Sequence, residues 1–269
     1  MKRSIALFSI ALLALAGCYT NPVTGRKSLV AIPVSQELSL GEQSFTEVKR
    51  TTKVSNDPGM NARVQRVGQR IASAVGDQLP SAKWEFVVFD SKDVNAFALP
   101  GGKVGVYTGL LQLAENDSEL AIVMGHEIGH VVARHGSERM TETALVALVG
   151  AGAAFALNER TDPQTRNMIL AAYGAGATVG VVLPHSRGNE SEADHMGAVF
   201  AAKAGYDPRA SISFWQKMVK QGEAAGKSGG KVAALFSTHP ADAKRIEDLQ
   251  KLMPEVLPIY EANRGKYSQ

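Results

Sequence analysis

Apolar and polar residues follow different periods in different parts of the 269-residue chain. Within residues 35–75 and 116–136, apolar residues recur about every three to four positions, which places them on one face of a helix. Residues 84–107 instead hold short apolar runs separated by turn residues, which is the pattern of strands. The pattern therefore predicts a mainly helical α+β chain with one small sheet.

Three short extended segments predict that sheet. Residues 84–90 read WEFVVFD, residues 93–99 read DVNAFAL and residues 103–107 read KVGVY. The run Pro100–Gly102 is a strong turn signal between the second and third segments. We expect the three strands to pair as a small antiparallel sheet.

Turn and cap signals bound the first helices. The sequence NDPG at residues 56–59 divides the helical region 35–75 in two. Asn116 is a good N-cap for the next helix, and Glu119 three residues later would complete a capping box. Gly136 is the expected stop of that helix.

Helical periodicity returns in the second half of the chain. Residues 189–204 are predicted to form a helix that ends at Gly205, and a charged C-terminal helix is predicted from Ala241 onward. Between them, residues 221–231 (QGEAAGKSGGK) are rich in glycine and predict a flexible loop.

Two Ala- and Gly-rich apolar runs, at residues 143–157 and 168–183, predict an apolar helical hairpin over residues 143–183. A transmembrane helix needs roughly 20 apolar residues, and both runs are shorter. This composition best fits a hairpin that is packed against the protein or forms a lid. A contact with the membrane or with another copy of the chain is the alternative, and a transmembrane hairpin is least favoured.

The N-terminus predicts export. Lys2 and Arg3 precede an apolar run at residues 5–16, too short for a stable span and typical of a signal peptide over residues 1–17. The sequence LAGC ending at Cys18 resembles a bacterial lipobox, which implies lipidation of Cys18 and a lipidated tether over residues 18–34. The alternative is a plain secretory signal with an incidental cysteine.

Cys18 is the single cysteine, so the chain forms no internal disulfide. Tyr19, rather than aspartate, follows it, and in the lipoprotein pattern this favours the outer membrane. We therefore expect a lipid-anchored protein on the periplasmic face of the cell envelope.

Charge argues against a nucleic-acid partner. The formal net charge is +3, from 29 basic and 26 acidic residues. The first 17 residues hold two bases and no acid, so their removal leaves 27 basic against 26 acidic residues, or +1. A nearly neutral chain lacks the basic excess that nucleic-acid binding needs.

The sequence GHEIGHVVARHG at residues 125–136 holds the main candidate chemistry. His126 and His130 are four apart, about 40° round a helix, so both imidazoles leave one face and can share a zinc ion. Glu127 lies about 100° from His126, close enough to take a proton from a zinc-activated water. His135 lies nearly opposite His126 and is excluded as a ligand, so we interpret it as a histidine at the helix C-terminus.

A third ligand can come from residues 186–197, which read SRGNESEADHMG. Glu190 and Asp194 share a face, so Glu190 can complete a His-His-Glu set while Asp194 accepts the free N–H of a ligand histidine. Glu192 is the rival ligand; it lies about 160° from Asp194, so the two cannot both face the metal.

Four ordered motifs carry a family resemblance: residues 95–102 (NAFALPGG), HEIGH, residues 190–194 (ESEAD), and residues 237–240 (STHP) followed by Arg245. In this order they resemble the gluzincin family of HtpX and the CAAX prenyl protease, and most closely its soluble bacterial lipoproteins similar to LoiP and BepA. The segment NPVTGR after Cys18 also looks like those lipoproteins.

The resemblance implies a zincin-like fold over residues 35–262, built on an active-site helix. It implies one zinc per chain held by the His-His-Glu set, with Glu127 as the catalytic base. His239 would stabilise the oxyanion, and Arg245 would be structural. Asn95 and Ala96 would lie on an edge strand that pairs with an extended substrate.

We therefore expect a zinc endopeptidase that degrades unfolded or misassembled envelope proteins. One rival is a chaperone-like lipoprotein that binds clients with latent proteolysis, and another is a zinc amidase of the cell wall. A separate hypothesis is latency, in which His185 or another side chain near Glu190 would occupy or block the fourth zinc position in a resting state. Oligomerisation is left open.

Overall fold

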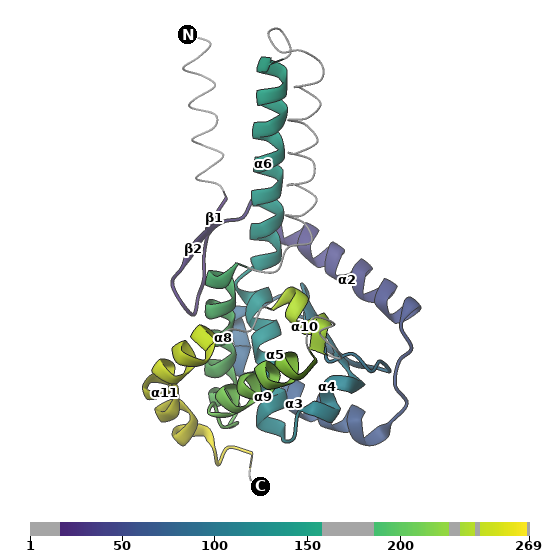
Figure 1. The fold of residues 1–269 in the computed structure, drawn as a ribbon, viewed down its shortest axis with the longest axis vertical. Coiled ribbons are helices and arrows are strands. Elements are labelled where there is room, and N and C mark those ends of the chain that lie inside the picture. Colours follow the sequence, from purple (N-terminus) through teal and green to yellow (C-terminus); the bar gives the residue numbers. More distant parts are fainter. Residues whose placement is uncertain (1–16, 158–185, 226–231, 240–242, 268–269) are drawn as a thin grey trace. The chain divides into compact units, whose positions relative to one another are not determined.

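The computed structural model describes residues 17–157, 186–225, 232–239 and 243–267 (Figure 1). The predicted signal segment up to residue 16, the second apolar run at residues 168–183 and His185 lie outside the described residues. The expected hairpin over residues 143–183 is therefore described only in its first half.

The described chain is mainly helical with two small sheets, which confirms the α+β class. The strands are β1 (Cys18–Thr20), β2 (Lys27–Leu29), β3 (Glu85–Phe89), β4 (Ala96–Leu99) and β5 (Lys103–Tyr107). The helices are α2 (Val34–Thr51), α3 (Pro58–Val75), the 3-10 helix η1 (Gly76–Gln78), α4 (Thr108–Leu113), α5 (Asp117–Val132), α6 (His135–Leu157), α8 (Arg187–Lys203), α9 (Ala210–Ala225), α10 (Ala233–Thr238) and α11 (Ala243–Asn263).

The chain divides into two compact units. The first holds residues 1–21, 25–34 and 134–183; the second holds residues 22–24, 35–133 and 184–269. We describe each by itself.

The described part of the first unit is the antiparallel hairpin of β1 and β2 together with α6. The guanidinium of Arg26 donates two hydrogen bonds to the Glu138 carboxylate, at 2.8 and 2.7 Å. The amide of Ala31 donates to Thr141 Oγ1 at 3.0 Å. These bonds hold the predicted tether against the start of α6. Within the described residues, no helix is long and apolar enough to cross a membrane.

The larger sheet, in the second unit, has the strand order β3–β5–β4. Gly101 and Gly102, with φ of 89° and 80°, form the turn that makes β4 and β5 antiparallel, as predicted. β3, however, pairs with β5 in parallel, so the sheet is mixed. β4 pairs with one edge of β5. β3 pairs with the other edge and runs in the same direction as β5. β4 is thus an edge strand.

The helix α5 lies at the centre of the second unit and packs against α3, α8, α9 and β4 (Figure 1). Its apolar side chains, among them Leu120, Met124 and Ile128, are fully buried in the main core. A helix that is apolar on nearly all sides must be buried on all sides. The side chains that carry the candidate chemistry are therefore held on a rigid element.

The start of α5 departs from the predicted capping box in one detail. Asn116 Oδ1 accepts a hydrogen bond from the Glu119 amide at 2.9 Å, as an N-cap should. The Glu119 carboxylate, however, accepts from the amide of Glu115 at 2.8 Å instead of that of Asn116. It also pairs with Lys217 Nζ at 2.9 Å, which draws it toward α9.

Two predicted boundaries are wrong. α5 ends at Val132 rather than at Gly136, because Arg134 turns the chain with a left-handed φ of 57°. Arg134 NH2 holds that turn by donating to the carbonyl of Ile32 at 2.7 Å. α9 continues to Ala225, so the first half of the predicted loop at residues 221–231 is helical.

Candidate metal centre

Four buried side chains of the second unit converge on one point. They are His126, His130, Glu190 and His239, and one ligand atom from each lies within 4.8 Å of all the others. The first two come from α5, the third from α8 and the fourth from the residue after α10. Each is at most 6% exposed, so the cluster is closed to bulk water.

The distances between these ligand atoms fit a tetrahedral ion. His126 Nε2 lies 3.1 Å from His130 Nε2, 3.2 Å from His239 Nδ1 and 3.5 Å from Glu190 Oε2. Glu190 Oε1 lies 3.3 Å from His130 Nε2 and 3.1 Å from His239 Nδ1. Bonds of about 2.0–2.2 Å to a tetrahedral zinc separate its ligands by about 3.3–3.6 Å. The spacing of the four donor groups therefore fits a tetrahedral zinc ion.

The charges of the cluster also favour a cation. Burial would lower the pKa of His126, but the neighbouring carboxylates of Asp194 and Glu190 raise that pKa to about 10. Burial would raise the pKa of Glu190, but hydrogen bonds with the three histidines hold it well below its usual range. Buried carboxylates that stay ionised need a compensating positive charge, which a metal ion supplies.

Close packing of two helix backbones sets the position of the ligands. A Cβ added to Gly197 of α8 would lie 2.8 Å from the backbone nitrogen of His126 on α5. A Cβ on Gly125 would lie 3.0 Å from the carbonyl oxygen of Gly197. Only glycines allow the two helices to approach so closely. This approach brings Glu190 to the histidines.

Arg245 of α11 neutralises two carboxylates beside the cluster. It donates to both oxygens of Asp194, at 2.8 and 2.7 Å, and its NH1 lies 3.0 Å from Glu190 Oε2. The ring of Trp215 lies 3.8 Å below the guanidinium carbon, close enough for a cation–π interaction. Trp215 was not predicted as part of the site, because it belongs to none of the sequence motifs.

Asp194 connects Arg245 to the ligand set. Its Oδ1 lies 3.0 Å from His126 Nδ1, at hydrogen-bond distance, although the alignment of a hydrogen bond is not met in this conformation. Burial would raise the pKa of Asp194, but the charge of Arg245 lowers it, so the carboxylate stays ionised. It is therefore placed to hold the free nitrogen of His126.

Glu127 lies beside the cluster without being part of it. The side chain is buried, and burial raises the pKa of its carboxyl. Its Oε1 lies 3.4 Å from His239 Nε2. His239 itself presents Nδ1 to the other three donors, so four side chains rather than three could hold a metal ion. The role at a substrate oxygen expected of His239 stays a prediction.

The sequence profile of Peptidase family M48 matches residues 58–253. That stretch includes α5, α8 and every member of the cluster. The chain belongs to peptidase family M48.

Curated M48-like relatives match over most of the chain. The mitochondrial metalloendopeptidase OMA1 of Schizosaccharomyces pombe is 32% identical over 237 residues, 87% of this chain and 66% of the relative. The beta-barrel assembly-enhancing protease of Escherichia coli is 27% identical over 243 residues, 89% of this chain and 48% of the relative. The chain thus spans about half to two thirds of these proteins. The predicted family is confirmed, and so is the metalloendopeptidase class.

Two residues weighed as ligands lie outside the M48 metal cluster. Glu192, the rival of Glu190, is buried and accepts a hydrogen bond from Thr24 Oγ1. His135 is fully buried and begins α6, so it is not a histidine of the α5 C-terminus. Neither belongs to the group of converging donors found among the described residues.

The candidate substrate-binding residues lie on the edge strand of the M48 sheet. Ala96 pairs with Val106 of β5, and the carbonyl of Asn95 accepts from the Tyr107 amide at 3.0 Å. Asn95 Oδ1 accepts from the Ala96 amide at 3.0 Å. β4 also packs against α5, which carries the two ligand histidines.

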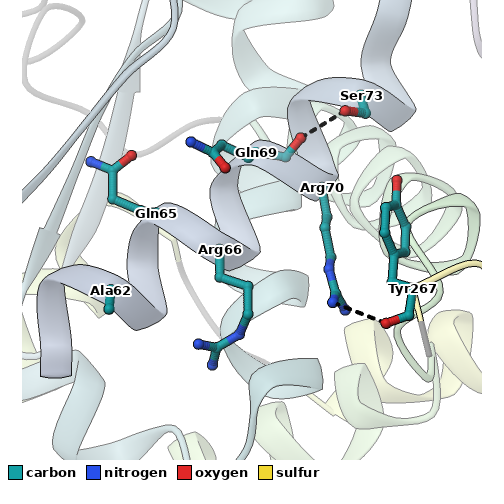
Figure 2. A pocket seen from close by; sticks show the side chains of 7 residues that line it. All are labelled: Ala62, Gln65, Arg66, Gln69, Arg70, Ser73 and Tyr267. Atoms are coloured by element: carbon teal, nitrogen blue, oxygen red, sulfur yellow. Dashed lines mark hydrogen bonds between the residues drawn. The ribbon is translucent and has the colours of Figure 1, made fainter. Parts of the chain in front are cut away.

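A separate pocket of about 480 Å³ lies along α3 and shares no lining residue with the metal cluster (Figure 2). Its lining residues are Ala62, Gln65, Arg66, Gln69, Arg70, Ser73 and Tyr267. Arg66 is paired with Asp117 at 2.7 Å, and Arg70 stacks on the Tyr267 ring at 4.4 Å. Because both cations are already engaged, the pocket offers little chemistry of its own.

Proposed function

We propose that this M48 chain is a zinc-dependent endopeptidase, anchored in the bacterial cell envelope, that hydrolyses unfolded or misassembled envelope proteins. The observation that carries the proposal is a buried His-His-Glu set with a second buried glutamate, Glu127, beside it. His126, His130 and Glu190 would hold one zinc per chain. When bound, zinc polarises a carbonyl and lowers the pKa of water toward about 7.

The surrounding residues supply the rest of the chemistry. Glu127 takes the proton of the attacking water and passes it to the leaving amine, the task of a general base and then a general acid. Asp194 orients His126, and Arg245 keeps Asp194 ionised. The backbone of Ala96 at the start of β4, and of Asn95 directly before it, pairs with an extended peptide, so recognition depends little on side-chain identity.

His239 has two roles in this proposal. In the resting state its Nδ1 would take the fourth coordination position of the metal, which a catalytic zinc site keeps open. A peptide must displace it to reach the site. Once displaced, the imidazole lies near the carbonyl and stabilises the oxyanion as it forms. His239, rather than His185, is then the side chain that makes the resting enzyme latent.

The location follows from the N-terminus. Cys18, the proposed lipidation site, is exposed at the start of β1. With residues 1–17 removed as a signal peptide, its acyl chains would anchor the protein to the periplasmic face of the outer membrane. The substrates are then extended or unfolded polypeptides of that compartment. The name of the Escherichia coli relative, a beta-barrel assembly-enhancing protease, supports an envelope role.

The second candidate is a chaperone-like lipoprotein whose edge strand holds clients while proteolysis stays latent. The position of His239 favours this second candidate, because a zinc ion held by four protein side chains would have no coordination position left for water. The buried Glu127 favours the enzyme, since a binding module needs no base.

Casein cleavage by the zinc-loaded protein and by Glu127→Gln separates the two functions. We expect the wild type to cleave and the variant to lose at least about 10²-fold in rate, because the proton acceptor is gone. Zinc content measured by atomic absorption should stay at one per chain, since Glu127 is not a ligand.

Two other outcomes contradict the proposed enzyme. A variant that still cleaves at the wild-type rate would remove Glu127 from the mechanism. If neither protein cleaves yet both suppress the aggregation of an unfolded client, the binding module is the function.

A further inference from the structure

Residues 22–24 (PVT) form the tip of the hairpin between β1 and β2, directly after the proposed lipid anchor. The strands of this hairpin belong to the first unit, whereas the three tip residues belong to the second. The tip is therefore part of the body that holds the metal cluster.

The contacts of the tip are specific. The Val23 side chain packs against the main hydrophobic core. Thr24 Oγ1 donates a hydrogen bond to the carboxylate of Glu192 on α8, across 168 positions of the sequence. Glu192 is only 7% exposed, so the bond joins a partly buried threonine to a buried carboxylate. A buried carboxylate that loses a hydrogen-bond donor is destabilised.

Glu192 lies on the side of α8 that faces away from the metal. It is two residues from Glu190 and two from Asp194, so it projects about 160° from each of them. Arg245 contacts both of those carboxylates on the metal side. Thr24 binds Glu192 on the opposite side of α8. Contacts on two opposite sides fix the rotation of a helix about its own axis.

We propose that Thr24 is a positioning residue for the metal centre: through Glu192 it sets the rotation of α8 and with it the place of Glu190. This inference rests on the proposed zinc site. A helix is about 5–6 Å in radius, so a rotation of about 10° moves a carboxylate by about 1 Å. Metal sites tolerate only about 0.2 Å in bond length. A small rotation is therefore enough to weaken zinc binding.

Zinc affinity, measured by competition with a chelator, tests the proposal on the full chain. Thr24→Val removes the hydroxyl and keeps the shape, and we expect it to lower zinc affinity by about tenfold, the usual effect of losing support behind a ligand. Thr24→Ser keeps the hydroxyl and should stay within about twofold of the wild type. The matched control is Thr20→Val, an exposed threonine in β1 of the same hairpin.

A double-mutant cycle assigns the effect to the bond. Glu192→Ala removes the acceptor, so Thr24→Val should add little to the loss that Glu192→Ala causes alone. If Thr24→Val does not fold, Thr24→Ala and Glu192→Ala take its place in the affinity measurement. The melting temperature of each metal-free variant shows how much of the change is general stability.

Zinc affinity of Thr24→Val within twofold of the wild type overturns the proposal, whatever its melting temperature. A melting temperature that falls while affinity is unchanged gives Thr24 a structural role only, which also overturns it. Failure of the proposed function is seen elsewhere, in a wild type that binds zinc without cleaving. A wild type that binds no zinc overturns both.

Discussion

Two glutamates of α8, two positions apart, have different surroundings. Glu190 lies among the three histidines, whereas Glu192 accepts from Thr24 on the other side of the helix. Both are buried, so neither burial nor residue type distinguishes them. The direction in which each leaves the helix decides which can bind metal.

Alanine variants test that assignment. Glu190→Ala should lose zinc, because it removes the only carboxylate among the converging donors and leaves neutral histidines to hold the ion. Glu192→Ala should still bind one zinc per chain at saturating zinc, although more weakly. Zinc content after gel filtration measures the first, and a titration measures the second. The reverse pattern would move the metal site by two residues along α8.

His239→Ala tests the two roles of that histidine. Zinc binding should persist on three protein ligands. A hydroxamate inhibitor should bind more tightly, because the fourth coordination position of the zinc is then open. The kcat for casein should fall by about 10²-fold, because the donor for the oxyanion is lost. A kcat equal to or above that of the wild type would leave His239 as a blocking ligand only.

At the scale of elements, the packing of α5 against α8 decides the site. Gly125 and Gly197 let the two backbones touch, and the neighbouring atoms at the contact are backbone atoms that cannot move aside. The predicted helices were right in kind, but their sequences do not state which faces meet. That contact joins residues about 70 positions apart, and only the folded chain shows it.

Gly197→Ala is expected to separate the helices. Its Cβ would lie 2.8 Å from His126 N, so we expect a loss of about 1–3 kcal/mol in stability and a weaker zinc site. Gly188→Ala, in the same helix, is the control, because its nearest neighbour would be 3.8 Å away. Urea unfolding and zinc titration of both variants measure the difference. If Gly197→Ala and Gly188→Ala are equally stable, the contact between α5 and α8 has room for a methyl group.

At the scale of the whole molecule, the N-terminal segment does more than connect an anchor. Arg26 binds Glu138 within the first unit, and Thr24 binds Glu192 within the second. The described residues 18–34 thus form a hairpin and are hydrogen-bonded to other segments of the chain.

Replacing the anchor cysteine tests the proposed location. Cys18→Ala removes the thiol that would carry lipid, so the full chain expressed in a bacterium should move from the membrane fraction to the soluble periplasmic fraction. Thr20→Ala, two residues later, is the control and should stay with the membrane. A Cys18→Ala protein that remains with the membrane would show that another part of the chain holds it there.

The sequence by itself determined what depends on neighbours along the chain. The four-residue spacing of His126 and His130, the cap at Asn116 and the turn at Gly101 are local, so helix and turn geometry fix them. Tertiary structure alone decided the parallel pairing of β3 and β5, the place of His239 beside the other three donors and the bond from Thr24. Each of these joins distant segments, and their geometry follows from packing, which no local pattern encodes.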